Sequence, residues 1–106
     1  MTVKVVALYG QPQSPDDWEK RYLEEHVPMT TDVPGVRARR TARVLSTADG
    51  SESPYFYIAE LTFDDTGAAQ AAIASPAGQA LAADYAEHAP AGSLLLIVEE
   101  TLNDTV

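Results

Sequence analysis

Two segments near the ends of the chain are apolar at almost every position, and this restricts the folds open to it. Val3–Tyr9 is rich in β-branched residues and is closed by Gly10, and Ser93–Glu100 has a similar run of Leu, Ile and Val. Both have the length and composition of buried β-strands. Because successive side chains of a strand point to opposite faces, each strand presents apolar groups on both sides. The sheet therefore needs a covering layer on each face.

Further elements are indicated between these strands. Ser14-Pro15-Asp16-Asp17 supplies an N-cap residue, a proline at the first helical position and two acids in the first turn, so we expect a helix from there to about His26. Pro28 should end that helix, because a proline disfavours helical geometry in the residue before it. Val36–Leu45 and Tyr55–Phe63 read as two strands of a hairpin whose long loop contains Asp49-Gly50.

A second helical region follows the hairpin. Asp64-Asp65-Thr66 is expected to cap a helix over Gly67 to Ala74, and Ser75-Pro76 to start another that reaches about His88. The order is then βαββαβ, which is the α+β, ferredoxin-like arrangement with helices on one face of a four-stranded antiparallel sheet. We expect a single domain over residues 1–106, with a core over 3–100 and a tail over 101–106. The second sheet face predicts a homodimer with sheet-to-sheet packing around a shared barrel-like core.

Charge and composition exclude several functions. The formal net charge is -9 and the pI is near 4.4, so the chain should repel nucleic acid and anionic lipid surfaces. The absence of cysteine excludes disulfides and thiolate chemistry. No segment has the length of a membrane span or the pattern of a signal peptide, and we therefore expect no membrane partner and a cytoplasmic location.

The first helix carries the strongest candidates for chemistry. Trp18, Tyr22 and His26 are spaced four residues apart and therefore share one face, which should look onto the sheet. Trp18 and Tyr22 can be plain core residues, although a buried tyrosine hydroxyl needs a partner. His26 can act as a general base or contact a ligand, or it can serve only as a cap. Tyr9, at the end of the first strand, can reach the same cleft.

The two histidines do not predict a metal site. His26 and His88 each end a helix, and antiparallel helices should place them at opposite ends of the sheet unless the break at Ser75-Pro76 turns the chain back. No further ligand cluster or HxxxH spacing accompanies them. The chain also lacks phosphate-binding glycine loops and the GxSxG motif of serine hydrolases.

The second strand gathers positive charge in an acidic chain. It holds four of the seven basic residues, namely Arg37, Arg39, Arg40 and Arg43. They can block edge-to-edge strand pairing, or one of them can hold an anionic substrate carboxylate or phenolate. If Leu45 pairs with Tyr55, Arg40 faces Glu60, and a cross-strand ion pair would satisfy both groups. Glu60 can alternatively serve as an acid or base in a pocket.

Several of these segments together resemble a known family. Tyr22–Met29 followed by Val33-Pro34-Gly35 is similar to the YxxxHxP(L/M)…PG segment of EthD-like proteins, within the dimeric α/β-barrel superfamily. The resemblance extends over nearly residues 3–100, through Arg43-Val44-Leu45, Tyr57–Phe63 and Ala74–Gln79. It implies a ferredoxin-like homodimer with a pocket between sheet and helices in each subunit. It also implies pocket positions for His26, with Tyr22 and Trp18 beside it. Met29, in place of the commoner leucine, and Tyr9 are further candidate substrate contacts.

The resemblance leaves three functional hypotheses open. Family members are linked to oxidative breakdown of ethers, and related barrels include cofactor-free monooxygenases, polyketide cyclases or dehydratases, and haem-binding or haem-degrading enzymes. The first hypothesis is an oxidoreductase-type or cyclase/dehydratase-type enzyme, or an accessory to one, acting on a hydrophobic oxygen-bearing small molecule with His26 as base. The second is a non-catalytic module that sequesters or delivers such a molecule. The third is haem chemistry with His26 as axial ligand, although we expect no cofactor.

Overall fold

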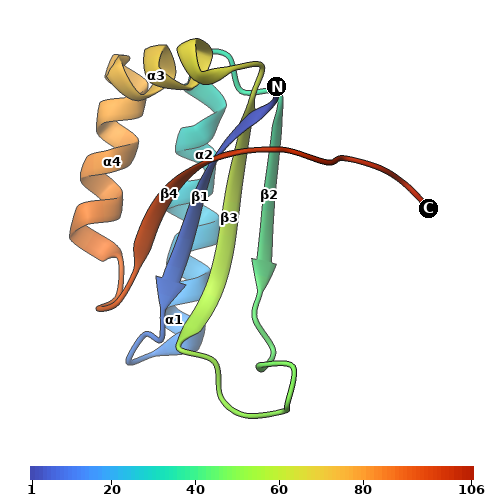
Figure 1. Cartoon of the computed structure of the whole chain (residues 1–106). Coiled ribbons are helices and arrows are strands. Elements are labelled where there is room, and N and C mark those ends of the chain that lie inside the picture. The colour runs from blue at the N-terminus through green and yellow to red at the C-terminus, as the bar shows by residue number, and fades with distance from the viewer.

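A computed structural model describes all residues 1–106 and shows a four-stranded antiparallel sheet with helices on one face (Figure 1). The strand order across the sheet is β2-β3-β1-β4, so the two strands at the ends of the chain are neighbours. This confirms the ferredoxin-like α+β fold. The strands are β1 (Val3–Gly10), β2 (Ala38–Arg43), β3 (Tyr55–Phe63) and β4 (Leu94–Glu99), and the helices are α1 (Pro15–Arg21), α2 (Val27–Met29), α3 (Thr66–Ala74) and α4 (Pro76–His88).

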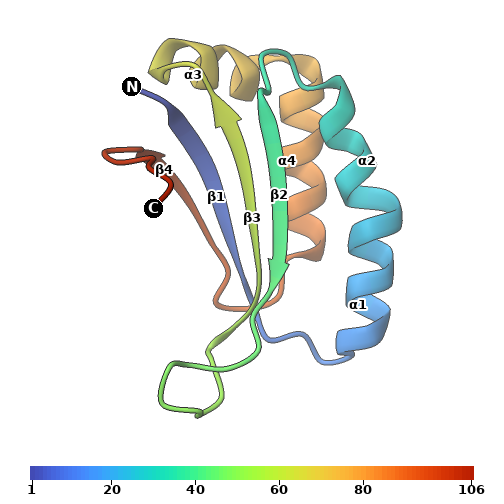
Figure 2. The ribbon, with the colours of Figure 1, turned by 90° about the vertical axis from the view of Figure 1, so that its right-hand side faces the viewer.

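The helices cover one face of the sheet and leave the other open (Figure 2). Side chains of β1 show the consequence, because Val3, Ala7 and Tyr9 face the helices and are buried, whereas Val6 and Leu8 on the other face are half-buried. On β4, Leu94 and Leu96 belong to this open face and are 45% and 42% exposed. The open face thus carries several apolar side chains beside the charged Lys4 and Glu60, and it lacks a covering layer within the chain.

The first helical region extends further than predicted. The helix begins at Pro15 as expected, but Ser14 makes no side-chain capping bond. After α1 a π-helical turn, Tyr22–His26, leads into α2 and then a 3-10 turn, Thr30–Asp32. The backbone N–H of Val27 donates to the carbonyl of Tyr22, five residues back. This wider turn accommodates Pro28, which would collide with a carbonyl in a continuous α-helix. The prediction that the helix ends near His26 is therefore wrong.

The second helical region follows the sequence prediction. The Asp65 carboxylate accepts from the N–H of Ala68 at 2.8 Å, and the Ser75 hydroxyl accepts from the N–H of Gly78 at 3.0 Å. These two caps start α3 and α4. A Cβ at Gly78 would lie 2.0 Å from the carbonyl oxygen of Ala72, so only glycine permits this close approach of the two helices.

Two apolar clusters pack between the sheet and the helices. One cluster lies against α3 and consists of Val3, Val33, Phe63, Ala69 and Ala72. We call it the aliphatic cluster because all its members except Phe63 are aliphatic. The aromatic cluster, at the opposite end of the same sheet face, consists of Ala7, Tyr9, Tyr22 and Tyr57, with Trp18 and Tyr85 packed against it.

The remaining features complete the outline of the molecule. None of the helices has both the length and the apolar character needed to cross a bilayer. Residues 101–106 lie beyond β4 and are exposed, and Figure 1 shows them leading away from the sheet.

Candidate functional site

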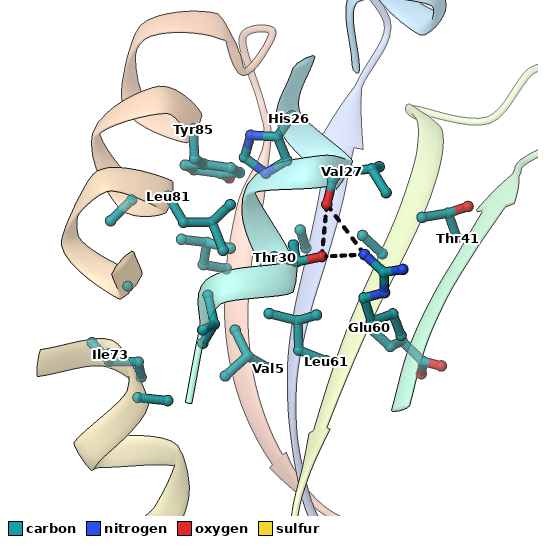
Figure 3. Close-up of a pocket in the computed structure, with 18 of the residues that line it drawn as sticks. Val5, His26, Val27, Thr30, Thr41, Glu60, Leu61, Ile73, Leu81 and Tyr85 are labelled. Atoms are coloured by element: carbon teal, nitrogen blue, oxygen red, sulfur yellow. Dashed lines mark hydrogen bonds between the residues drawn. The ribbon is translucent and has the colours of Figure 1, made fainter. Parts of the chain in front are cut away.

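A cavity of about 280 Å³ lies between the helix-facing side of the sheet and the two helical regions (Figure 3). Its floor consists of two rows of paired residues that cross all four strands. One row is Arg39, Leu61, Val5 and Ile97, and the next is Thr41, Ala59, Ala7 and Leu95. The small Ala59 and Ala7 stand at the centre of the second row, where larger side chains would fill the space. The cavity thus occupies the gap between the aliphatic and aromatic clusters.

The walls of the cavity come from helical segments distant in the sequence. Tyr22, His26, Val27 and Thr30 line one wall, and Leu81 and Tyr85 of α4 line the opposite one. Seventeen of the 24 lining residues are hydrophobic. An apolar chamber with a few convergent polar groups is the usual form of a small-molecule site.

His26 is buried on this wall, with 8% of its surface exposed. Its Nδ1 lies 2.6 Å from Oδ2 of Asp84, and its Nε2 lies 3.5 Å from the hydroxyl oxygen of Tyr9. The ring stacks on Tyr22, with centroids 5.4 Å apart and planes inclined by 20°. Since a carboxylate only accepts hydrogen bonds, this contact fixes the proton on Nδ1. Nε2 is then free to exchange a proton at the cavity wall.

Asp84 is held as an anion by its partners. Arg21 donates two hydrogen bonds to its two carboxylate oxygens, one of them 2.5 Å long. This guanidinium, with a smaller contribution from His26, opposes the effect of desolvation and lowers the pKa of Asp84 to about 2. The carboxylate therefore stays ionised at neutral pH, where it orients the imidazole.

The phenols beside His26 stay neutral. Burial raises the pKa of Tyr9 and of Tyr22 well above the usual range, and burial also raises the pKa of Tyr85. All three line the cavity. At neutral pH each can donate a hydrogen bond to a ligand oxygen, and Tyr9 lies closest to Nε2 of His26.

The two histidines do not lie at opposite ends of the sheet, which corrects the sequence prediction. Nδ1 of His88 lies 3.4 Å from Oδ1 of Asp84, so both rings approach the same carboxylate. Because the first helical region continues past His26, that residue sits within its length rather than at its end. No group of three metal-binding side chains converges on one point.

The residues around His26 also bear on the haem hypothesis. Its Nε2, the atom that would bind iron, faces the hydroxyl of Tyr9 at 3.5 Å, and its Nδ1 is taken by Asp84. An iron at Nε2 would lie against this hydroxyl and could not accept its hydrogen bond, whereas a substrate oxygen at the same place can accept it. The local arrangement therefore does not fit a haem iron at His26.

The other predicted contact residues divide into two groups. Tyr9 and Tyr22 line the cavity, whereas Trp18 and Met29 do not. Trp18 stacks on Tyr22 at 5.0 Å, and its Nε1 donates to the carbonyl of His88 at 3.1 Å. In the continued helix, the face that passes through His26 and Thr30 leaves Met29 on the flank, because each residue rotates the side chain by about 100°.

The predicted ion pair between Arg40 and Glu60 is wrong, although the register behind it is right. Arg40 does face Glu60 across β2 and β3. The carboxylate of Glu60 instead approaches Nζ of Lys4 at 3.7 Å. Lys4 lies on β1, on the same open sheet face, and β1 is the other neighbour of β3. Arg40 and Glu60 both border the cavity.

Two polar residues of the site, Asp84 and Thr30, were not singled out by sequence analysis, and Arg39 was named there only as one of four arginines that could hold an anionic substrate. Asp84 had one available signal, namely an acid in an alanine-rich helix four residues before His88. Thr30 and Arg39 are joined by a hydrogen bond of 2.9 Å from the guanidinium to the hydroxyl, one of the dashed lines in Figure 3. The expected break at Pro28 had removed Thr30 from the helix that places it.

Comparisons with known proteins find similar sequences and similar overall structures. Residues 10–90 match the EthD domain family. A Rhodococcus erythropolis protein named "Uncharacterized 11.0 kDa protein in thcB-thcC intergenic region" is 33% identical over 97 residues, which cover 92% of this chain and 93% of that protein. The crystal structure of an EthD family protein from Bacillus halodurans superimposes with a TM-score of 0.90 at 32% identity, covering 95% of this chain and 100% of that one.

More distant structures share the fold alone. SnoaB from Streptomyces nogalater, a cofactor-independent oxygenase, has a TM-score of 0.68 at 17% identity, covering 96% and 95% of the two chains. The hydroxynitrile lyase from Passiflora edulis has a TM-score of 0.75 at 13% identity, covering 96% and 97%. A dimeric ferredoxin-like protein from Thermobifida fusca has a TM-score of 0.69 at 16% identity, covering 92% and 90%.

Proposed function

This chain belongs to the EthD family, and on that premise we propose that it is a homodimeric enzyme acting on a hydrophobic, oxygen-bearing small molecule, with His26 as general base. The observation that carries the proposal is the contact of 2.6 Å between His26 and Asp84 at the wall of an apolar cavity. A buried histidine held in one tautomer by an ionised carboxylate is a common arrangement for proton transfer.

The proposed step is the transfer of one proton. The substrate lies in the cavity with a phenol O–H or an activated C–H directed at Nε2 of His26, and the proton passes to that nitrogen. The imidazolium that forms is stabilised by Asp84, whose own charge is maintained by Arg21. The neutral hydroxyl of Tyr9 donates a hydrogen bond to the negative charge that develops on the substrate oxygen.

The fold neighbours support two outcomes for the resulting anion. One neighbour is a cofactor-independent oxygenase and another is a hydroxynitrile lyase. An electron-rich carbanion or phenolate can react with dioxygen, and an alkoxide can expel a leaving group. Loss of a substrate proton can begin either reaction, so the same pair of residues serves both classes.

The homodimer is supported by the open face of the sheet. This face carries the half-exposed Leu94 and Leu96, and a dimeric ferredoxin-like protein has the same fold. Burial of such a surface in a second copy would supply the missing layer. We expect sedimentation equilibrium to report a dimer at micromolar concentration and Leu96→Asp to shift it to monomer, whereas a monomeric unsubstituted protein would contradict this part of the proposal.

The base role can be tested without the natural substrate. 2-Tetralone is an apolar bicyclic ketone with acidic C–H bonds beside its carbonyl, and NMR in D₂O follows the exchange of those protons. We expect the protein to accelerate this exchange about a hundredfold, the size of a typical general-base contribution. His26→Asn should abolish the acceleration, because the amide retains a similar shape but cannot accept the proton.

The matched control is the other histidine. His88 lies outside the lining of the cavity, and we expect His88→Asn to keep most of the acceleration. If His26→Asn exchanges as fast as the unsubstituted protein, the base role is wrong. If the protein binds 2-tetralone without accelerating exchange, the result favours a module that holds or delivers its ligand.

A further inference from the structure

We propose that Arg39 is the anchor for an anionic head group, so that the ligand of this cavity is an apolar carboxylate whose far end faces His26. This inference rests on the proposed function and names the substrate class of the same site. It starts from the position of Arg39 at the β2 end of a cavity floor that is otherwise formed by Leu61, Val5 and Ile97 in the same row.

The guanidinium of Arg39 is oriented but not neutralised. Its Nη1 donates to the hydroxyl of Thr30 at 2.9 Å and approaches two further oxygens, of Val27 and Thr31, at 3.5 Å each. The hydroxyl of Thr30 in turn donates to the carbonyl of Val27 at 2.7 Å and is thereby fixed. Nε and Nη2 make no hydrogen bond within the chain, so one edge of the planar fork is available to an oxyanion.

Three of the four other arginines are paired with a carboxylate, and the fourth, Arg40, is unpaired on the open sheet face, where its strand neighbour is Glu60. Arg21, Arg37 and Arg43 each make two or more hydrogen bonds to a carboxylate, those of Asp84, Asp64 and Glu19. Arg39 has no carboxylate partner in a chain with 16 acidic residues and a net charge of -9. Edge protection of the sheet would be served equally well by a neutralised arginine. The missing counter-charge therefore points to a ligand.

The rim of the cavity suits a charged group better than its interior. A second hollow, of about 390 Å³, adjoins the cavity and shares Thr30, Val33 and Arg39 with it. A carboxylate placed at Arg39 stays in contact with this polar hollow and keeps part of its hydration, which limits the cost of desolvation. The hydrocarbon part of the ligand then lies over the apolar floor.

The spacing of the two polar points sets the size of the ligand. Thr30, which holds the guanidinium, follows His26 by four residues, so the two lie about 6 Å apart along the helix axis. A fused pair of six-membered rings spans a similar length between the two ring carbons that carry its end substituents, and the substituents extend from there to the polar side chains. 6-Hydroxy-2-naphthoate can therefore place its carboxylate at Arg39 and its phenol at Nε2 of His26.

The test compares this compound with its neutral isostere, 6-hydroxy-2-naphthamide, by isothermal titration calorimetry. We expect the carboxylate to bind about ten- to a hundredfold more tightly, the effect of hydrogen bonds to a charged group. Arg39→Gln should remove that preference and leave the affinity for the amide unchanged. Arg43→Gln is the control, because it makes the same change of charge at an exposed residue that lines neither the cavity nor the adjoining hollow.

The possible outcomes distinguish failure of the Arg39 anchor from failure of the proposed base role of His26. If Arg39→Gln keeps the preference, or if Arg43→Gln loses it equally, Arg39 is not the anchor. If the amide binds as tightly as the carboxylate, the preference for an anionic ligand is refuted, whereas the proposal of an apolar binding cavity is retained. If the protein does not accelerate 2-tetralone exchange but its preference for the carboxylate depends on Arg39, the base role of His26 is refuted and the role of Arg39 as anchor is supported. If the protein binds neither naphthalene compound, the inference is overturned.

Discussion

The aliphatic and aromatic clusters lie on the same face of one sheet, yet they are built from different chemistry. The aliphatic cluster contains no polar side chain, and the helices approach closely enough over it that only glycine fits at position 78. The aromatic cluster contains three tyrosines, and His26 and Asp84 lie beside it in a chain of hydrogen bonds. The aliphatic end therefore stabilises the fold by close packing, whereas the aromatic end contains polar groups that need hydrogen-bond partners.

The cavity lies between these two ends, and its position follows from the contrast. Large aromatic rings occupy the space at the aromatic end, and closely packed helices occupy it at the aliphatic end. Between them, the small side chains of Ala7 and Ala59 leave space above the sheet unfilled. A site at this position is bordered by the closely packed aliphatic cluster on one side and by the polar groups of the aromatic end on the other. The substitutions below test this division, and they are ordered by expected loss of stability.

The largest effect is expected at the aliphatic end. Phe63 is 1% exposed and stands at the centre of that cluster. Phe63→Ala should lower the free energy of unfolding by about 4 kcal/mol, because it removes buried surface and leaves a void. Urea denaturation measures the change, and Leu45→Ala, at a side chain that is 90% exposed, is the control that should stay near the unsubstituted value. Equal effects at both positions would refute the assignment of this core.

A second test of the same end adds volume instead of removing it. Gly78→Ala places a Cβ 2.0 Å from a backbone oxygen and should cost about 3 kcal/mol of unfolding free energy, since the helices must move apart. Gly67→Ala is the matched control, because the nearest atom there is a side-chain oxygen at 3.5 Å. We expect that variant to be neutral or slightly stabilised. A neutral Gly78→Ala would show that the helix junction is loose.

At the aromatic end, Asp84→Asn is expected to cost about 2 kcal/mol in stability, because hydrogen bonds to charged partners are lost. The effect on proton transfer should be larger in proportion, since the amide no longer fixes the tautomer of His26 or stabilises its cation. We expect 2-tetralone exchange to fall about a hundredfold. Glu87→Gln makes the same charge change at an exposed site of α4 and should leave the exchange rate intact.

The pKa of Asp84 also predicts how the stability of the folded protein depends on pH under acidic conditions. The pKa of Asp84 is lowered in the folded state to about 2, below its ordinary value of about 3.9. Its contribution to stability is therefore complete above pH 4 and declines as the pH falls toward 2. Thermal unfolding between pH 2 and pH 5 should show a weaker pH dependence in Asp84→Asn. Parallel curves for the two proteins would mean that other groups cause the acid limb.

The smallest effect is expected for Tyr9→Phe. The ring and its packing remain, and the lost hydroxyl makes only a long contact of 3.5 Å with His26, so stability should fall by less than about 1 kcal/mol. The rate of 2-tetralone exchange should fall about tenfold if the hydroxyl stabilises the developing oxyanion. An unchanged rate would show that Tyr9 belongs only to the packing of the aromatic end.

The elements themselves were predictable because their signals are local. Ser75-Pro76 marked the junction of α3 and α4, and Tyr55–Phe63 was located to the residue. Pairing Leu45 with Tyr55 across the hairpin was sufficient to place Arg40 opposite Glu60. The same reasoning did not find the partner of Glu60, because Lys4 comes from a strand more than fifty residues away in the sequence.

Sequence alone determined the βαββαβ order, the family and the face shared by Tyr22 and His26, since each depends on short-range pattern. Only the tertiary structure decided that Pro28 is accommodated in a continued helix, that Asp84 and Arg21 meet at His26, and that Arg39 has no carboxylate partner. These outcomes depend on which side chains packing brings within hydrogen-bond reach across three elements. Such distances are fixed by the balance of burial and backbone geometry over the whole domain.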